Sequence, residues 1–242
     1  MNRLVSLLVN DGKNAIRDDI LPVVACIPVF LVLLIRFGEP QLQAVLPASI
    51  DLSVHHPAVI AVLTCMTPMM FGWVIGFMLL EEREEHVLSA IAITPLTKRG
   101  YLLYRITLVT VVSIVLTAVL IPLSGLSGIS GLTMPRYLII SVMAALEAPF
   151  FALILATLAG NRVEGLAVAK LLGIIVIPPI LPFYFDSPAV YLSGIIPSYW
   201  IGEALTRIDG PFPSFVGPVV VGFVLHFITL RGGLAYFSRR GD

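Results

Sequence analysis

The amino-acid sequence predicts an all-α integral membrane protein with six transmembrane helices. Of its 242 residues, 58% are hydrophobic and only 12% are charged, and the mean hydropathy is +0.99. Soluble domains carry about 25% charged residues, so this chain lacks the ionic groups that a water-exposed surface needs. The apolar residues are also gathered in six long runs. These observations exclude a soluble enzyme and a nucleic-acid-binding protein, and they make the lipid bilayer the expected surroundings.

Six apolar runs are long enough to cross a bilayer, which takes about 20 residues with a range of roughly 17–25. No polar stretch between them is long enough to fold by itself. The sequence therefore predicts a single transmembrane domain over residues 1–242. The six expected spans are residues 19–37, 57–80, 103–123, 137–160, 165–185 and 215–237.

The N-terminal residues 1–18 have the pattern of an amphipathic helix that lies in the membrane interface. Their polar residues recur at helical spacing, with leucines on the opposite side. The apolar stretch Leu4–Val9 is short for a signal peptide and charged residues follow it, so a cleaved signal is not expected. A polar tail without helical structure is the alternative.

Basic residues predict the orientation, because Lys and Arg resist translocation whereas Asp and Glu have little effect. With both termini inside, twelve of the fifteen basic residues lie on the cytoplasmic side and only Arg36, Arg136 and Arg207 lie outside. An even number of spans also places both termini on one side. We therefore expect a multi-pass protein of the cytoplasmic (inner) membrane with both termini in the cytoplasm.

Two outer segments connect the spans. Residues 38–56 are expected to form a polar, solvated loop, in which the neighbouring His55 and His56 do not share a helical face and so make no metal pair. Residues 186–214 are longer and mixed in character. Within them, 197–205 predict a short helix at the outer interface with aromatic anchoring, and a re-entrant segment is allowed where protein covers its backbone.

The cytoplasmic segment 81–105 between the second and third spans carries the densest charge. One helical stripe is acidic and another, with Val87, Leu88 and Ile91, is apolar; Thr94 and Pro95 then end the helix. The segment predicts a short amphipathic helix on the cytoplasmic side. Acidic side chains do not suit an anionic leaflet, so its partner is a protein if it has one. A solvated connecting loop is the alternative.

Glu147 is the one carboxylate expected deep in the membrane. It follows Arg136 by 11 residues, about 16 Å along a helix. A carboxylate at that depth must be paired, protonated or exposed to water. Pro149 has no N–H group and leaves the carbonyl of Ala145 without its helical partner, which opens the helix locally. Two roles are open for Glu147: a structural bond with a neighbouring helix, and a place on the translocation path or in proton-sensitive gating. Lys170 is close enough to the inner interface to anchor there.

Two other classes of membrane protein fit the sequence less well. An intramembrane serine protease would use Ser127, in a Gly-Leu-Ser-Gly stretch, with His226 in the last span. Those two residues are expected at different depths, and catalysis needs them within about 3 Å. A channel or ion-coupled transporter usually carries several intramembrane charges, whereas Glu147 is the firm one here. The two cysteines, Cys26 and Cys65, lie in apolar runs, which indicates buried side chains and neither a disulfide framework nor a metal site. No catalytic residue is expected.

The segment after the second span resembles the corresponding segment of ABC-2-type export permeases. The pattern is a pair of acidic residues, then Val-Leu, a Thr-Pro-Leu stop, and Tyr-Leu with a basic residue at the start of the next span. The matching residues are Glu84, Glu85, Val87, Leu88, Ala90, Thr94, Pro95, Leu96, Tyr101, Leu102 and Arg105. The N-terminal interfacial helix, the six spans and Ile196–Trp200 after the fifth span also fit. Within this group, which has the type V exporter architecture, the chain is most similar to small fluoroquinolone-export-type permeases.

The resemblance implies that segment 81–96 is a coupling helix that docks into a cytoplasmic ABC ATPase. A second, smaller contact with the ATPase is implied for Asn161, Arg162 and Glu164. The chain has no phosphate-binding loop of its own, because its only Gly-Lys is followed by Asn14. No cofactor is therefore expected in this chain, and ATP and Mg²⁺ belong to the partner. The coupling residues that the resemblance indicates are Glu82, Glu84, Glu85, His86, Val87, Leu88, Ala90, Ile91, Thr94 and Pro95.

The resemblance further implies export by a homodimer or by a heterodimer with a related permease. The chain is then a transport subunit and not an enzyme. A mostly apolar interior favours a hydrophobic or amphipathic substrate, for which a drug such as a fluoroquinolone, haem, a lipid and a peptide all remain candidates.

Overall fold

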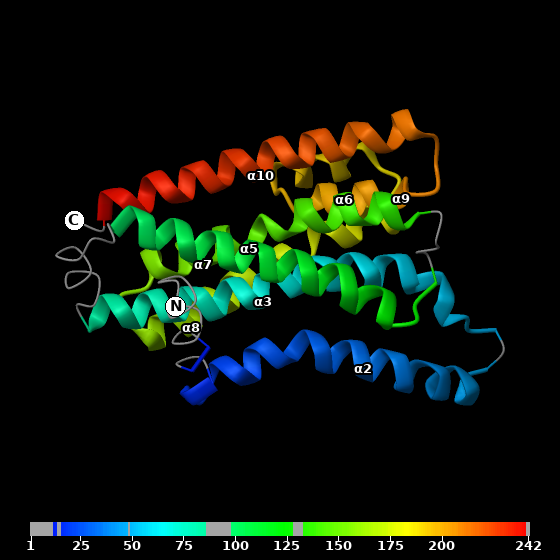
Figure 1. The fold of residues 1–242 in the computed structure, drawn as a ribbon. Helices are drawn as coiled ribbons and strands as arrows, with labels where there is room; N and C mark the ends of the chain where they lie inside the picture. The colour runs from blue at the N-terminus through cyan, green and yellow to red at the C-terminus, as the bar shows by residue number, and fades with distance from the viewer. Residues whose placement is uncertain (1–11, 14–15, 48, 86–97, 128–132, 241–242) are drawn as a thin grey trace.

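A computed structural model describes all residues except 1–11, 14–15, 48, 86–97, 128–132 and 241–242 (Figure 1). The described residues are helical and contain no strand. Six helical segments are long and apolar enough to cross a membrane, which confirms the expected fold class. Most of the expected interfacial helix and the segment from His86 to Pro95 lie outside the described residues.

The helices follow one another up and down the bundle, and two of the expected spans consist of more than one element. The fourth span is α6 followed by α7, and the fifth is α8 followed by two 3₁₀ helices. In chain order the elements are α2 (Leu21–Val45), η1 (Leu52–His55), α3 (His56–Glu84), α5 (Lys98–Leu123), α6 (Met134–Ala145), α7 (Glu147–Leu158), α8 (Arg162–Leu172), η2 (Gly173–Val176), η3 (Pro178–Phe183), η4 (Pro188–Ile195), α9 (Tyr199–Thr206) and α10 (Phe212–Arg240).

Prolines and one glycine mark several of the helix boundaries. Pro22, Pro57 and Pro135 stand in the first turn of α2, α3 and α6, where a missing N–H costs nothing. Gly125 follows the end of α5 with φ of +78°, a left-handed conformation that side chains with a Cβ rarely adopt. In contrast, α2 continues to Val45, so the expected polar loop over 38–56 is wrong for its first part.

The bundle has two ends, which we name by the chain. At the proximal end α2 begins and α10 ends; at the distal end α2 ends and α10 begins (Figure 1). The centre is formed by α3 with the α6–α7 pair: 72% and 67% of their apolar windows are buried, against 17–28% for the other four spans. Those four spans therefore present most of their apolar surface to the surroundings, as expected in lipid. Cys26 on α2 is exposed, contrary to expectation, whereas Cys65 on α3 is buried.

Two glycines bring α3 and α7 into backbone contact. A Cβ on Gly72 would lie 2.5 Å from the carbonyl oxygen of Ala148, and a Cβ on Gly76 would lie 2.8 Å from the Leu155 side chain. Glycines four residues apart on one face are a common device for close helix packing in membranes. The two helices therefore act as one rigid element.

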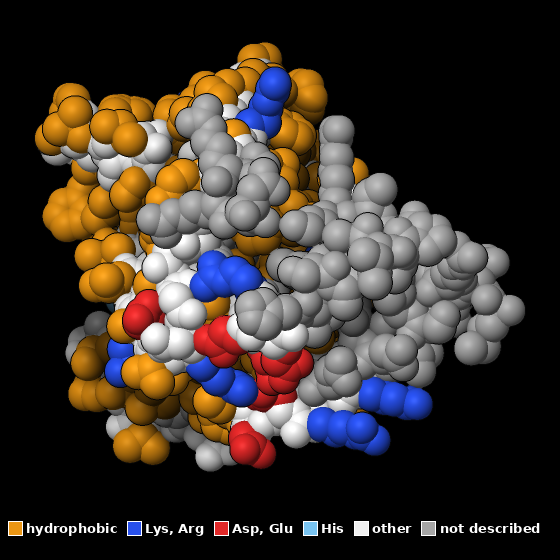
Figure 2. Space-filling model, turned by 90° about the vertical axis from the view of Figure 1, so that its left-hand side faces the viewer, with side chains coloured by type: hydrophobic (Ala, Val, Ile, Leu, Met, Phe, Trp, Pro, Cys, Tyr) orange, Lys and Arg blue, Asp and Glu red, His pale blue; other side chains and the backbone are white. Residues whose placement is uncertain are grey.

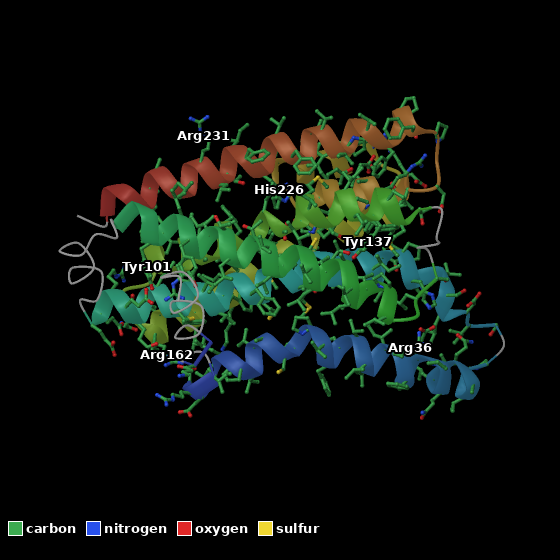
Figure 3. All side chains as sticks on the ribbon, viewed as in Figure 1. Arg36, Tyr101, Tyr137, Arg162, His226 and Arg231 are labelled. Atoms are coloured by element: carbon green, nitrogen blue, oxygen red, sulfur yellow. The ribbon has the colours of Figure 1, made fainter. Side chains whose placement is uncertain are left out.

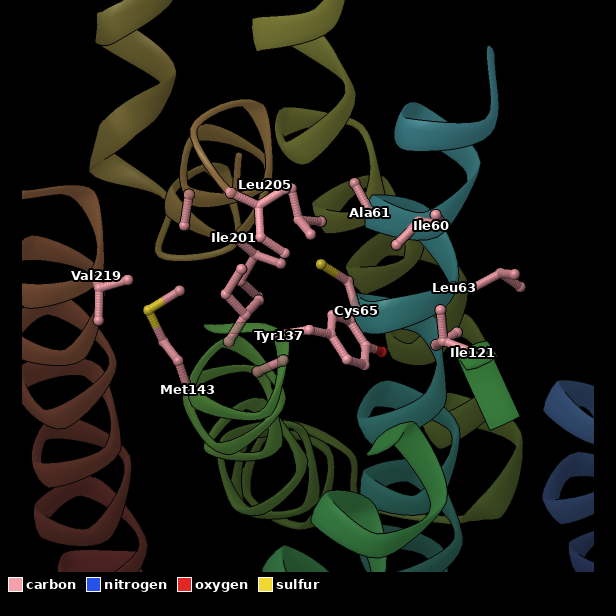
Figure 4. Close-up of a cluster of buried hydrophobic side chains, with 14 of the residues drawn as sticks. Ile60, Ala61, Leu63, Cys65, Ile121, Tyr137, Met143, Ile201, Leu205 and Val219 are labelled. Atoms are coloured by element: carbon pink, nitrogen blue, oxygen red, sulfur yellow. The ribbon is translucent and has the colours of Figure 1, made fainter. Parts of the chain in front are cut away.

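The short helix expected within 186–214 exists as α9, and it is packed inside the bundle. Tyr199 is 1% exposed and Ile201 is 0% exposed, because α9 packs against α3, α6, α10 and η3. Figure 4 shows Ile201 and Leu205 of α9 directed toward Cys65 and Tyr137. Tyr199 is therefore covered by protein, and α9 is part of the core of the bundle's distal half; anchoring at a membrane interface stays a prediction.

Candidate functional site

The helix of the fourth span is interrupted where Glu147 was expected to open it. Helix α6 ends at Ala145, Leu146 makes a tighter bond to the carbonyl of Met143, and α7 begins at Glu147. Pro149 stands in the first turn of α7, where it is tolerated. The break places the Glu147 side chain at the junction of two helices, midway along the bundle.

Glu147 faces His226 of α10. Both side chains are buried, with 4% and 2% of their surface exposed. The Nε2 atom of His226 lies 3.5 Å from Oε1 of Glu147, and neither carboxylate oxygen has a hydrogen-bond partner. His226 Nδ1 donates to the carbonyl of Gly222 at 2.7 Å. His226 points into the bundle, in contrast to Arg231 on the same helix (Figure 3).

The Glu147–His226 pair lines a cavity of about 240 Å³ between α7, α10 and the segment that leads into α9. Apart from the pair and the hydroxyls of Ser198 and Thr229, its walls are apolar. The cavity is lined by Glu147, Phe150, Phe151, Ile175, Ile195, Ile196, Pro197, Ser198, His226 and Thr229.

A second cavity, also of about 240 Å³, continues the same seam between α7 and α10 toward the proximal end. It is lined by Phe150, Leu153, Ile154, Thr157, Leu158, Gly232, Gly233 and Tyr236. Phe150 lines both cavities and thus stands between them. The two cavities therefore adjoin each other along one mainly apolar seam between α7 and α10.

Arg83 ties the proximal end of α3 to the end of α7. Its guanidinium donates to the carbonyls of Ala156 at 2.7 Å and Ala159 at 2.5 Å, which the last turn of α7 leaves without helical partners. A cation at the end of a helix is also favoured by the helix dipole. Arg83 therefore joins the base of the expected coupling segment to the helix whose other end carries Glu147.

A second link joins α3 to α5. Arg105 is 1% exposed and bonds to the carboxylate of Glu82. The Tyr101 hydroxyl donates to the same carboxylate at 2.6 Å and accepts from Arg105 Nε at 3.0 Å. Of the expected coupling residues, Glu82 is thus half-buried in a helix-to-helix contact, whereas Glu84 and Glu85 are exposed. The others lie outside the described residues.

The second expected contact region, the loop before α8, has its own bonds. Asn161 caps α8 by accepting the N–H of Glu164, and Glu164 in turn accepts the N–H of Gly160. Arg162 donates to the carboxylate of Asp18 at 2.6 Å. Lys170 is exposed in the last turn of α8, as its expected role as an anchor requires.

Asp18 also receives the first backbone N–H groups of α2, from Ile20 and Leu21. Burial by itself raises the pKa of the Asp18 carboxyl, but the hydrogen bond from Arg162 and the two backbone N–H groups outweigh it and hold the pKa below its usual value. Figure 2 shows the charged groups gathered on this end of the molecule. They surround a recess of about 440 Å³ lined by Arg17, Asp18, Asp19, Leu21, Met78, Glu81, Glu82 and Glu85.

At the distal end, His56 is not in the solvated loop that the sequence predicts. It is 8% exposed, not solvated: Nε2 lies 2.6 Å from Glu39 Oε1, and Nδ1 accepts the N–H of Ser127 at 2.9 Å. Ser127 Oγ lies 2.8 Å from Nδ1 of His56, so Ser127 contacts His56, and the Ser127–His226 pair that the sequence suggested for a serine protease is not formed. His55 is exposed and contacts Tyr184. The part of the chain that the structure describes holds no cluster of metal-ligating side chains.

Three features of the site escaped the sequence-based predictions. His226 has no local signal, because its meaning depends on Glu147 across the bundle. Arg83 was counted only as a basic residue of the inner side. Gly72 and Gly76 do form a Gly-x-x-x-Gly motif inside an apolar run, and this motif could have identified the close contact of the second span.

Comparison with known proteins identifies relatives along almost the whole chain. The fluoroquinolones export permease proteins Rv2686c and MT2760 of two Mycobacterium tuberculosis strains are each 23% identical over 229 residues, which cover 92% of this chain and 90% of theirs. No solved structure matches. Residues 11–232 match the family described as fluoroquinolones export permease protein Rv2686c-like. With six membrane-spanning helices and a match of this extent, the chain belongs to the Rv2686c-like family of export permeases.

Proposed function

We propose that the chain is the membrane-spanning subunit of an ABC-2-type exporter, which moves a hydrophobic or amphipathic compound out of the cytoplasm with the energy of a separate ATPase. The observation that carries the proposal is the joint at Arg83. It connects the base of segment 81–96 to α7, and α7 begins at Glu147 in the cavity. A displacement imposed on the proximal end of α3 therefore reaches the cavity.

The coupling works through rigid contacts. The ATPase would dock on the proximal end, against segment 81–96 and against Asn161, Arg162 and Glu164. Glu84 and Glu85 are exposed there and offer acidic contacts to a basic groove. Because Gly72 and Gly76 hold the backbones of α3 and α7 together, a rotation of α3 carries α7 with it.

The substrate would travel along the seam between α7 and α10. Both cavities there have mainly apolar walls, which suits an apolar or amphipathic compound. The names of the relatives support a fluoroquinolone as one substrate; haem, lipid and peptide are the alternatives. ATP and Mg²⁺ would bind to the partner ATPase, and two permease chains, identical or related, would form the complete transporter. The proximal end faces the cytoplasm in this proposal, as the basic residues predict.

The proposal is tested by reconstitution of the permease together with an ABC ATPase of the same organism. Inside-out vesicles that contain both proteins should accumulate a fluorescent fluoroquinolone only when ATP is hydrolysed. Glu84→Lys combined with Glu85→Lys should abolish co-purification of the ATPase, whereas Lys170→Glu, a charge reversal outside the docking region, should not. Accumulation by proteoliposomes that hold the permease alone would contradict the proposal.

A proton-coupled transporter is a second candidate, which the buried Glu147–His226 pair favours. It predicts that the chain alone transports its substrate when a pH difference is imposed and no ATP is present. The same vesicles distinguish the two candidates, because one needs ATP and the ATPase and the other needs neither.

A further inference from the structure

The hydrogen bond between His226 and Gly222 determines which ring nitrogen of His226 carries a hydrogen. A carbonyl oxygen can only accept, so the 2.7 Å contact requires a hydrogen on Nδ1. In the neutral ring, Nε2 then bears no hydrogen and presents a lone pair. It lies 3.5 Å from Oε1 of Glu147. Two hydrogen-bond acceptors, Nε2 of the neutral imidazole and Oε1 of the carboxylate, therefore face each other.

This opposition is relieved by one proton shared by the pair. The proton sits either on Nε2, which makes an imidazolium next to a carboxylate, or on Glu147, which makes a carboxylic acid next to an imidazole. Both states have zero net charge. No proton would leave a bare anion, and two protons would leave a bare cation, in a site where Glu147 is only 4% exposed. The buried pair therefore holds one proton.

The other polar atoms of the cavity are also acceptors. The Ser198 hydroxyl donates to the carbonyl of Ile175 at 2.8 Å, and the Thr229 hydroxyl donates to the carbonyls of Leu225 and His226 at 3.0 Å. Their hydrogens are used in these bonds, so both present lone pairs to the cavity. Oε2 of Glu147 has no hydrogen-bond partner. An environment of acceptors favours a positively charged ligand and disfavours an anion.

The walls suit the remainder of such a ligand. Phe150 and Phe151 stand edge to face, with ring centroids 5.7 Å apart, and both line the cavity beside Glu147. Aromatic faces attract organic cations. The volume of about 240 Å³ is below the roughly 300–1,000 Å³ of sites that enclose drug-sized molecules. The cavity therefore holds one ring or short chain together with its charged group.

We propose that the Glu147 cavity binds the ammonium end of an organic cation and releases the proton of the Glu147–His226 pair when it does so. The cation replaces the proton: an O–H or N–H bond breaks, the proton leaves to solvent, and the carboxylate then faces the cation with His226 neutral. The net charge of the site stays zero before and after. The inference rests on the proposed function only in that it places this cavity on the substrate path.

The exchange involves few titratable groups. Among the described residues that line the cavity, Glu147 on α7 and His226 on α10 are the ionisable side chains. The next group that feels the charge of Glu147 is the buried thiol of Cys65 on α3. The η2, η4 and α9 side of the cavity contributes isoleucines, a proline and a hydroxyl. The proton released is thus assigned to the pair.

The test is binding of benzyltrimethylammonium to the full chain in lipid nanodiscs, without ATPase. This cation has no dissociable proton, so any proton released comes from the protein. Its neutral isostere, neopentylbenzene, has the same shape. Calorimetry in two buffers of different ionisation enthalpy should report about one proton released per cation, and the apparent affinity should rise about tenfold per pH unit while that proton is bound. The isostere should bind without proton release.

Glu147→Gln keeps the shape of the side chain. It should weaken binding of the cation by about tenfold or more and leave binding of the isostere unchanged. Glu39→Gln, the same change at the distal end, should leave both ligands unchanged. Retained binding of the isostere shows that a variant is folded. The proposal is overturned if the two ligands bind equally to the unmodified chain, if neither binds, if no proton is released, or if Glu147→Gln binds the cation undiminished. Because no ATPase is present, loss of ATP-driven export with intact cation binding would reject only the proposed function.

Discussion

Asp18 connects two segments of the proximal end through a single carboxylate. It accepts from Arg162, 144 positions along the chain, and from the first N–H groups of α2. The pKa of this carboxyl is held below its usual value by these donors. A group with a lowered pKa stabilises the fold at every pH above its unfolded value of 3.8 and loses this effect as the pH falls through its folded value.

Asp18→Asn should therefore lower the melting temperature of the detergent-solubilised protein at pH 7, by an amount that corresponds to about 1 kcal/mol. The difference from the unmodified chain should be constant between pH 5 and pH 8 and should shrink below about pH 4, where Asp18 itself becomes protonated. Asp19→Asn, a neighbouring change, is the control. A difference that grows toward low pH would contradict this assignment.

The partners of individual residues show what a single sequence can and cannot predict. Glu147 as a buried carboxylate follows from its expected depth in the membrane. The partners Asp18–Arg162, Glu39–His56 and Glu147–His226 join distant positions, and no local rule selects them. His56 in particular was expected to be solvated, because its burial comes from the neighbouring ends of α2 and α5.

Among the elements, the fourth and fifth spans show how proline decides helix continuity. Pro149 predicted the opening beside Glu147, because a missing N–H acts over one turn. The fifth span was expected to be one continuous helix over 165–185. Instead, Pro178, Pro179 and Pro182 remove several N–H groups in close succession, and the segment adopts 3₁₀ turns. An apolar run indicates that a segment crosses the membrane, but not which helix type it forms.

Pro149→Ala should restore an N–H donor and allow α6 and α7 to join. Because Pro149 stands in the first turn of α7, the gain in stability should be well below the roughly 3 kcal/mol cost of a proline inside a helix. The junction that aims Glu147 at His226 would be lost, so binding of benzyltrimethylammonium should weaken while the melting temperature rises. Pro218→Ala, within α10 and outside both cavities, is the matched control. Unchanged cation binding would mean that the break does not orient Glu147.

Helix α3 depends on the absence of a side chain at Gly72. An added Cβ would meet the backbone oxygen of Ala148 at 2.5 Å, and a backbone atom of a packed helix cannot move aside alone. Gly72→Ala should therefore destabilise the protein by about 1–3 kcal/mol, measured as a lower melting temperature in detergent. Gly38→Ala in α2, where nothing lies within 4 Å, should be neutral or slightly stabilising. Equal effects of the two changes would show that α3 and α7 are not in backbone contact.

At the scale of the whole molecule, the charged contacts between segments and the apolar cavity lie in different regions. Charged groups gather at the proximal end (Figure 2), where Arg83, Arg105 and Arg162 join neighbouring segments. The cavity lies along the bundle and is almost entirely apolar. The sequence predicts both regions, through the acidic cluster and through Glu147, but it does not predict the connection between them. That connection depends on two carbonyls at the end of α7, which no residue type reveals.

Arg83→Ala should separate the two regions without removing either. The bonds to Ala156 and Ala159 would be lost, so the last turns of α3, beyond the Gly72–Gly76 contact, could move without carrying the end of α7. In vesicles that contain the ATPase, we expect the permease to bind the ATPase and ATP to be hydrolysed, while fluoroquinolone accumulation falls at least tenfold. Cation binding to the isolated chain should be unchanged, because Glu147 and His226 are untouched. Arg231→Ala, which removes an exposed arginine from α10, should leave both activities intact. If Arg83→Ala transports as well as the unmodified chain, the motion of the ATPase reaches the cavity by another route, and the joint at Arg83 serves stability alone.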